Sequence, residues 1–246
     1  MKKTKIIIPA LAMLLLGTAA SVTGTVAWFS MNDTVTATGM KVTAKSDAAF
    51  LLISAGEKDA AGVQSDKLTT ATAKNASAQL FPVANENITN STTAETIVSG
   101  KYSNWYYMYS EDPNSATGKA STKANIAEAD FAKYVLKNQF SISVAVGSNG
   151  VSNLKVKEAT ISTSGDQAVK VLVTTGDAFQ EFSGTGDNTP ADNTVLQASI
   201  TSSTVCLVNV YIYWDGNDSD VYTNGIADLL ETSVVLSFTG DIVPVE

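Results

Sequence analysis

The sequence predicts an all-β protein: a jelly-roll-like β-sandwich with long polar loop insertions and one or two short helices, preceded by a signal peptide. Three observations support this fold class. Apolar and polar residues alternate over 134–146, further short apolar segments are separated by Gly, Asn and Asp turns, and few patterns are typical of helix starts. With 246 residues, 44% of them hydrophobic, the chain can bury the core of one large domain.

The N-terminus has the three parts of a secretory signal. Lys2, Lys3 and Lys5 precede an apolar stretch over 6–16, and small residues follow it. A membrane-spanning helix needs roughly 20 apolar residues, so this stretch is too short to serve as one. Small residues at the −3 and −1 positions allow cleavage after Ala20 or after Ala27. We therefore expect a secreted protein with no stable membrane insertion after cleavage.

The clearest predicted strand covers residues 134–146. Apolar residues fall mostly on even positions and polar residues on odd ones, so one face of this strand should pack on a core. Asn149-Gly150 is a strong hairpin signal, and a second strand is expected over 151–162. These two strands are predicted to form an antiparallel hairpin.

Further strands are predicted along the rest of the chain. The strand over 204–214 is apolar on both faces, so it should be central under a covering element or meet another subunit. The other expected strands cover 34–45, 49–54, 103–109, 167–174, 194–201 and 232–239.

Helical patterns are few. Asn125 and Glu128 form a capping box that predicts a short helix over 127–132, and a second short helix is expected over 222–230. The long polar segments 55–93, 110–124 and 184–193 are predicted to be loops. No internal repeat is evident, so residues 28–246 are expected to form a single domain if cleavage follows Ala27.

Composition excludes several classes of function. The chain has no histidine and a single cysteine, Cys206, so it lacks His-based metal sites, Ser-His or Cys-His nucleophile pairs and intramolecular disulfides. Cys206 lies in an apolar strand, where a thiol behaves as a small hydrophobe. The net charge of −8 and the absence of arginine make nucleic acid a poor partner. We predict no catalytic residue and no cofactor: the protein is not an enzyme.

Three candidate sites have simpler explanations. Asp215, Asn217 and Asp220 resemble the start of a calcium loop, but the Gly and the bidentate Glu of an EF-hand are missing, and an acidic turn needs no metal. Glu158, Glu181 and Asp220 are carboxylates of the type that glycosidases pair, yet most such groups are solvated surface charges. The aromatic run 105–109 could stack on sugars, although core packing or a subunit contact is the simpler use.

The signal junction and the segment after it resemble a known family. Residues 24–30 read Gly-Thr-Val-Ala-Trp-Phe-Ser, and residues 33–44 read Asp-Thr-Val-Thr-Ala-Thr-Gly-Met-Lys-Val-Thr-Ala. This resembles the TasA/camelysin family of Gram-positive surface and biofilm-matrix proteins over about residues 5–45. The resemblance implies a dedicated signal peptidase that cleaves between Ala27 and Trp28. It also implies a jelly-roll subunit that polymerises into extracellular fibres on the cell surface or in the biofilm matrix.

By the same resemblance, the new N-terminal segment, residues 28–37, would act as a donor strand that completes the sheet of the next subunit. Trp28, Phe29, Val35 and Ala37 would anchor it. The implied partners are copies of the same chain and a related minor fibre subunit. Some camelysins have been described as metalloproteases, but without His this sequence does not support that activity.

A second function remains open from the sequence. A monomeric surface adhesin or carbohydrate-binding module could use the aromatic run 105–109 or the loop that starts at Asp215. The two alternatives differ in oligomeric state and in whether Trp105 contacts a ligand.

Overall fold

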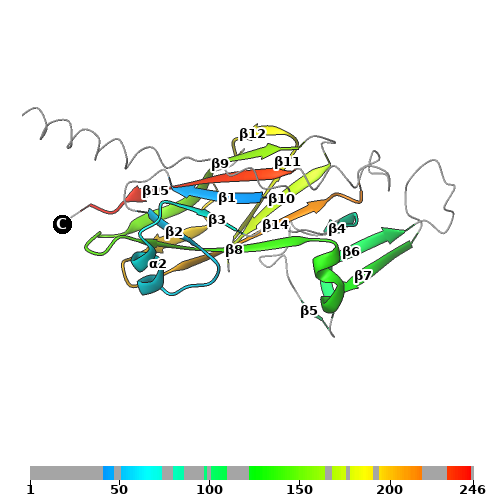
Figure 1. Ribbon diagram of the computed structural model, residues 1–246, viewed down its shortest axis with the longest axis horizontal. Coiled ribbons are helices and arrows are strands. Elements are labelled where there is room, and N and C mark those ends of the chain that lie inside the picture. Colours follow the sequence, from blue (N-terminus) through cyan, green and yellow to red (C-terminus); the bar gives the residue numbers. More distant parts are fainter. Residues whose placement is uncertain are drawn as a thin grey trace, which may run out of the picture. The chain divides into compact units, whose positions relative to one another are not determined.

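The computed structural model (Figure 1) describes residues 41–46, 51–73, 80–85, 97–98, 101–109, 122–163, 168–175, 178–190, 194–217 and 232–244. The chain divides into two units, residues 1–37 and 38–246, and every described residue belongs to the second. Strands predominate in it, with two short helices, α2 (Ala60–Asp66) and the 3₁₀ helix η2 (Glu128–Lys133), which confirms the all-β prediction. In this described part, no helix is long and apolar enough to cross a membrane.

The first sheet, sheet A, joins the two ends of the second unit. Its strands follow the order β12 (Gly186–Asn188), β9 (Val151–Ser162), β15 (Ser233–Ile242), β1 (Lys41–Ser46) and β3 (Thr70–Thr72), and β13 (Gln197–Ile200) also pairs with β9. The first described strand, β1, lies parallel to the last one, β15, whereas the other pairs of this sheet are antiparallel.

The second sheet, sheet B, is antiparallel throughout. Its order is β11 (Phe179–Ser183), β10 (Val169–Thr174), β14 (Cys206–Trp214), β8 (Leu136–Val144) and β2 (Leu51–Ala55). The strand predicted over 204–214 is therefore the central strand of this sheet. Its two outermost strands, β11 and β2, are among the short ones.

The two sheets share one hydrophobic core. Alternate residues of each strand point into it because side chains along a strand alternate between faces. Sheet A contributes Val234, Leu236 and Phe238, and sheet B contributes Phe140 and Ile142, all fully buried. Each such side chain stabilises the fold by about 1.5–3 kcal/mol. As predicted, one face of the strand expected over 134–146 packs on a core, but the other face does not meet water throughout: Ser141 and Ser143 are fully buried, and their hydroxyls donate to the carbonyls of Gly56 and Thr204.

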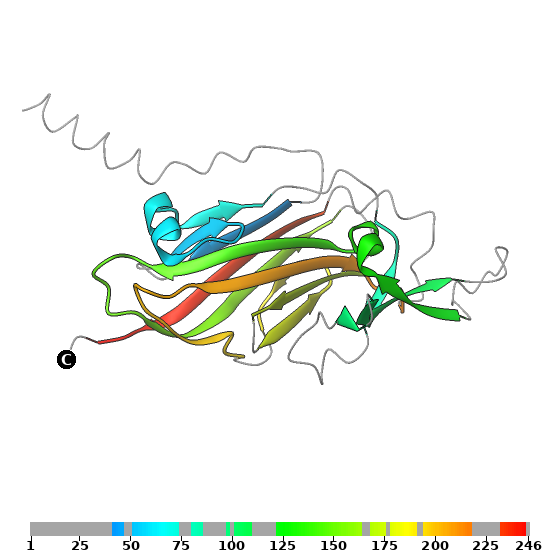
Figure 2. The same cartoon turned by 90° about the horizontal axis from the view of Figure 1, so that it is seen from below.

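The predicted hairpin between 134–146 and 151–162 is wrong. Strand β8 belongs to sheet B and β9 to sheet A, so the loop between them carries the chain from one sheet to the other (Figure 2). Gly147 and Gly150 allow this loop to turn, since both have a positive φ, +83° and +113°, which residues with a side chain rarely adopt. A Cβ on Gly150 would lie 2.7 Å from the Ile200 carbonyl oxygen, so only glycine fits there.

A third sheet, sheet C, is not among the predictions, although it contains the strand expected over 103–109. It consists of β4 (Val83–Asn85), β6 (Lys101–Tyr109), β5 (Ile97–Val98) and β7 (Thr122–Ala127), and with η2 it covers the outer face of sheet B through a second core. Trp105 of β6 lies 5.0 Å from Tyr213 and 5.9 Å from Tyr211, measured between ring centroids. Strand β14 is apolar on both faces because each face meets a core, as the first of the two predicted alternatives requires.

The helix and loop predictions need corrections. The helix expected over 127–132 is the 3₁₀ helix η2, and Asn125 lies in β7 instead of capping it; Ala127 occupies the cap position with no side-chain hydrogen bond. The segment 55–93 is not a mere loop: it contains β3, β4 and α2, whose N-cap Asp59 accepts a hydrogen bond from the Gly62 N–H at 2.8 Å. Likewise, 184–193 contains β12. The helix expected over 222–230 and most of 110–124 lie outside the described residues.

Candidate functional site

Among the described strands, β11 stands at one end of sheet B. The Thr175 N–H donates to the Ala178 carbonyl, so that pair is hydrogen-bonded, and the bonding alternates along the strand from there. Phe179, Glu181 and Ser183 therefore direct their N–H and C=O groups away from β10. Among the described residues no strand pairs with this edge.

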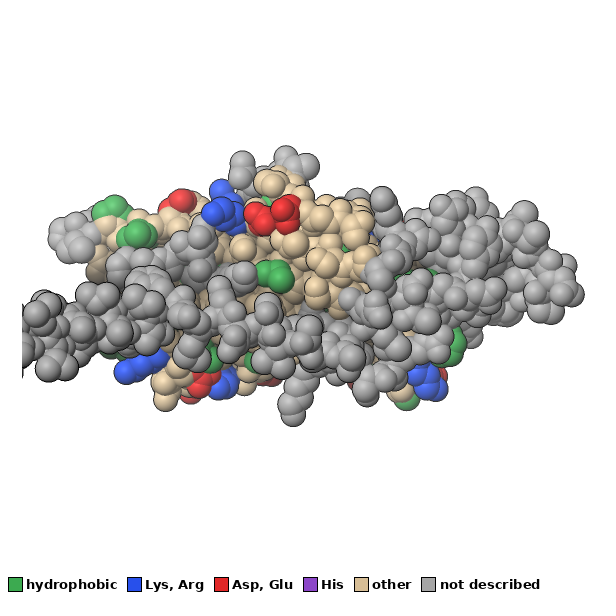
Figure 3. All heavy atoms as spheres, turned by 45° about the horizontal axis from the view of Figure 1, so that its top comes forward, with side chains coloured by type: hydrophobic (Ala, Val, Ile, Leu, Met, Phe, Trp, Pro, Cys, Tyr) green, Lys and Arg blue, Asp and Glu red, His purple; other side chains and the backbone are tan. Residues whose placement is uncertain are grey.

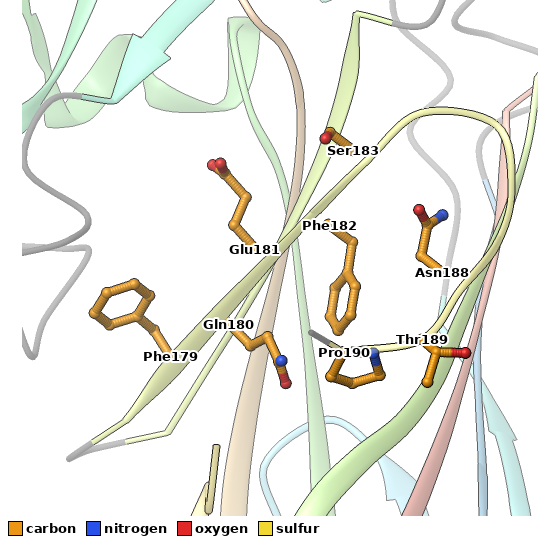
Figure 4. A pocket seen from close by; sticks show the side chains of 8 residues that line it. All are labelled: Phe179, Gln180, Glu181, Phe182, Ser183, Asn188, Thr189 and Pro190. Carbon is orange, nitrogen blue, oxygen red and sulfur yellow. The ribbon is translucent and has the colours of Figure 1, made fainter. Parts of the chain in front are cut away.

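A groove of about 320 Å³ lies along this edge (Figure 4). It is bounded by β11 on one side and by the segment 188–190, which follows β12 of sheet A, on the other. The side chains of Gln180 and Phe182 point to the side of Pro190, and those of Phe179 and Glu181 point to the opposite side. The groove thus runs between the edge strands of the two sheets, with the buried Phe182 ring in its wall.

Within the described residues, this edge lacks the usual protection against strand pairing. Edge strands are often blocked by Pro, by an exposed Lys or by a covering segment. Strand β11 reads Phe-Gln-Glu-Phe-Ser and has neither Pro nor Lys. At the other end of sheet B, by contrast, the Ile53 N–H of β2 donates to the Leu68 carbonyl at 2.8 Å. The two ends of sheet B therefore differ in whether a new strand can pair there.

The one charge on β11 belongs to a polar cluster on the outer face of sheet B. The Glu181 carboxylate accepts hydrogen bonds from the Tyr213 hydroxyl and, at 3.1 Å, from the Lys170 Nζ. The same Nζ lies 3.2 Å from Asp215 Oδ2. Burial lowers the pKa of Lys170, but the carboxylates of Glu181 and Asp215 outweigh it and hold that pKa above its ordinary 10.5. The Glu181 carboxylate is thus held by Lys170 and Tyr213, on the neighbouring strands β10 and β14, and is directed away from the edge.

This cluster predicts a loss of stability in alkali. Burial, and then Glu181, raise the pKa of Tyr213 well above 10.0. Because the folded protein keeps protons on Tyr213 and Lys170 that the unfolded chain releases, the free energy of unfolding should fall as the pH rises above about 10. Urea unfolding at pH 8 to 11 measures this, and Tyr213→Phe should flatten the decline. An equally steep decline in that variant would show that the phenol contributes nothing.

The predicted calcium loop is only partly described. Asp215 Oδ1 accepts a hydrogen bond from the Asn217 N–H at 2.9 Å, while Oδ2 faces the Lys170 ammonium. Asp220 lies outside the described residues. Within the part of the chain that is described, no three acidic, Cys or His residues are grouped so as to hold a metal. The Asp215 carboxylate is thus engaged by the cluster.

The other predicted site residues are not brought together. Glu158 lies on β9 of sheet A and accepts a hydrogen bond from the Thr160 hydroxyl, whereas Glu181 lies on β11 of sheet B. Trp105 is fully buried in the second core, so its ring is used for packing. Cys206 is also buried, and burial raises the pKa of its thiol to about 12, as expected of an inert core cysteine.

The residues of the predicted donor segment and the cleavage position lie outside the described residues. These are Ala27, Trp28, Phe29, Val35 and Ala37. The β11 edge, in turn, was missed by the sequence analysis. A usable signal was present: Gly176-Asp177 separates two apolar segments, and such a pair is typical of a two-residue hairpin turn.

The comparisons with known proteins do not point to a function, so the function is argued from this geometry. No protein-family model, curated protein or solved structure matches the chain.

Proposed function

We propose that this protein is a secreted structural subunit of an extracellular fibre or biofilm matrix, which polymerises head to tail by donating its N-terminal strand. Residues 1–27 would be the export signal, and residues 28–37 of one subunit would pair with the β11 edge of the next. The outer edge of β11, which pairs with no strand of the described part of the chain and lies beside a groove, is the observation that supports this most. Crossings between sheets at 145–150 and 184–185 are compatible with a jelly-roll-like connection.

A donated strand suits this edge chemically. Backbone N–H and C=O groups are strong hydrogen-bonding groups, and an added strand satisfies them along β11 while its side chains enter the groove. Donation to a different surface of the next copy is heterologous and does not close, so it produces a fibre and not a dimer.

In this proposal the strand comes from another copy. Contacts of β2 with β1 and β3 place these strands at one side of the sandwich, and the short link 184–185 places β11 and β12 at the other. Lys41, where the described chain begins, is therefore on the side of the sandwich away from β11.

The segment has the composition that such a strand needs. Phe29, Val35 and Ala37 stand at odd positions and share one face of a strand, and Trp28 adds a second ring. Each ring that becomes buried contributes about 4–6 kcal/mol before the costs of ordering. In the view of Figure 3, charged side chains of the described residues form only small separate groups of both signs.

Substitution at Ser183 tests the edge with a matched pair. Ser183 is exposed and its N–H points away from β10, so Ser183→Pro removes one outward donor without breaking the β10–β11 ladder. We expect Ser183→Pro to keep the parental melting temperature within a few degrees and to form far fewer filaments in negative-stain micrographs. Ser183→Ala, which keeps the N–H, should assemble like the parent. Equal assembly of both variants would exclude this edge as the acceptor.

Cleavage of the proposed export signal is tested separately. N-terminal sequencing of the secreted form should begin at Trp28. A start at Ser21 would indicate cleavage after Ala20 and a longer donor segment.

A further inference from the structure

The parallel pair β1–β15 joins the first and the last described strands in the middle of sheet A (Figure 1). Six residue pairs are in register, from Lys41 opposite Ser233 to Ser46 opposite Phe238. Because the strands are parallel neighbours, the chain enters at one end of this ladder and leaves at the other. Figure 2 shows the same two strands side by side.

This arrangement determines how the ladder responds to force. A pull on the residues before Lys41, opposed by a pull on the residues after Ile242, acts along both strands in opposite directions. The hydrogen bonds of a parallel ladder are evenly spaced, so such a shear loads all of them together. A pull that separates the strands from one end would load the same bonds one after another.

Both strands are also anchored on their other sides. Strand β1 pairs with β3 over Thr43–Lys45, and the Ala73 N–H donates to the Val42 carbonyl at 3.1 Å. The side chains of Val42 and Ala44 are fully buried in the shared core. Strand β15 is paired along its length with β9. A load that reaches β1 is thus distributed into the centre of the sheet.

We propose that the β1–β15 ladder is a mechanical clamp, and that this protein has a load-bearing function along the axis of these two strands. In a fibre made by donation of residues 28–37, tension would enter each subunit directly before β1 and leave it through the β11 edge, so that β1 would be pulled along its length against β15 and β3. The clamp itself depends only on the fold of a single chain. Its test on monomers is therefore independent of whether the chain polymerises.

Single-molecule force spectroscopy on the full mature chain tests this with two pairs of attachment points. The shear pair uses Thr38→Cys and a cysteine added after Glu246. The peeling pair uses Ser46→Cys and Ser237→Cys, which lie at the same end of the ladder, since Ser237 is opposite Lys45. Cys206 is buried and its thiol has a pKa of about 12, so coupling goes to the introduced thiols.

With six register pairs loaded together instead of in succession, the unfolding force of the shear pair should exceed that of the peeling pair by at least about twofold. Both proteins should show the same urea midpoint, which excludes a difference in overall stability. Equal forces, or a lower force for the shear pair, would overturn the clamp.

Discussion

Deletion of residues 28–37 from the mature protein should abolish filaments and leave soluble monomers. The segment would supply both the hydrogen-bonding partner of the β11 edge and the rings of Trp28 and Phe29, so its loss removes most of the free energy of subunit association. The described strands of the shared core all lie at or after Lys41, so the deletion leaves each of them in the chain. Size-exclusion chromatography and negative-stain microscopy measure the outcome, and circular dichroism should show an unchanged β content.

The deletion variant also provides a stricter test when mixed with the intact protein. It keeps its own β11 edge and can accept a strand, but it has none to donate. Added in a small proportion, it should therefore terminate growing filaments and shorten them. The matched control is a chain with residues 28–37 in scrambled order, which keeps the composition of the segment. It should fold like the intact protein but form fewer filaments. Filaments of normal length in the mixture would contradict strand donation.

Trp105→Ala should lower the free energy of unfolding by about 3–5 kcal/mol, as large-to-small changes in a core do. The Trp105 ring is fully buried and lies against Phe131, Tyr211 and Tyr213, with centroid distances between 5.0 and 5.9 Å. Its removal leaves a cavity between sheet C and sheet B. Urea unfolding monitored by circular dichroism measures the loss.

Trp105→Phe serves as the control, because it keeps an aromatic ring in the second core and should cost clearly less. The pair also separates the two functions that the sequence left open. An adhesin that uses Trp105 would lose glycan binding in a variant of normal stability, whereas a core residue loses stability first. Stability within 1 kcal/mol of the parent for Trp105→Ala would contradict the packing described for the second core.

Part of the fold could be predicted because it depends on local alternation. The strand predicted over 151–162 is β9 itself, and the one over 204–214 differs from β14 by two residues at its start. Period-two alternation reports which face is buried, and burial is what stabilises a strand. It does not report which strand is the neighbour, and that is why Asn149-Gly150 was read as a hairpin turn when it carries the chain between sheets.

Other elements are short or have mixed composition and depend on tertiary contacts. Helix α2 has one buried residue, Val63, and an Asp59 cap, so neither its length nor its periodicity identifies it in the sequence. Sheet C is stabilised by the outer face of β14, more than 100 residues further along the chain from β6. The sequence indicated that the strand over 204–214 is covered on both faces, either by another element of the chain or by a second subunit, but not which segment supplies the cover.

For the candidate site, too, local sequence predicts one part, and the other part depends on tertiary contacts. The resemblance over the first 45 residues directed attention to a donor strand, whereas nothing in it identifies an acceptor. The cluster of Lys170, Glu181, Tyr213 and Asp215 draws on three neighbouring strands, and only their register brings the four side chains together. The exposed edge of β11 depends in the same way on the order of the strands in sheet B.

Hydrogen exchange of the β11 amides tests the central claim most directly. In the truncated monomer the N–H groups of Phe179, Glu181 and Ser183 should exchange fast, because they point away from β10. In filaments of the intact chain these three amides should become protected by a strand from the neighbouring subunit. If they exchange equally fast in filaments, or if the new protection falls on other strands instead, the β11 edge is not where subunits join.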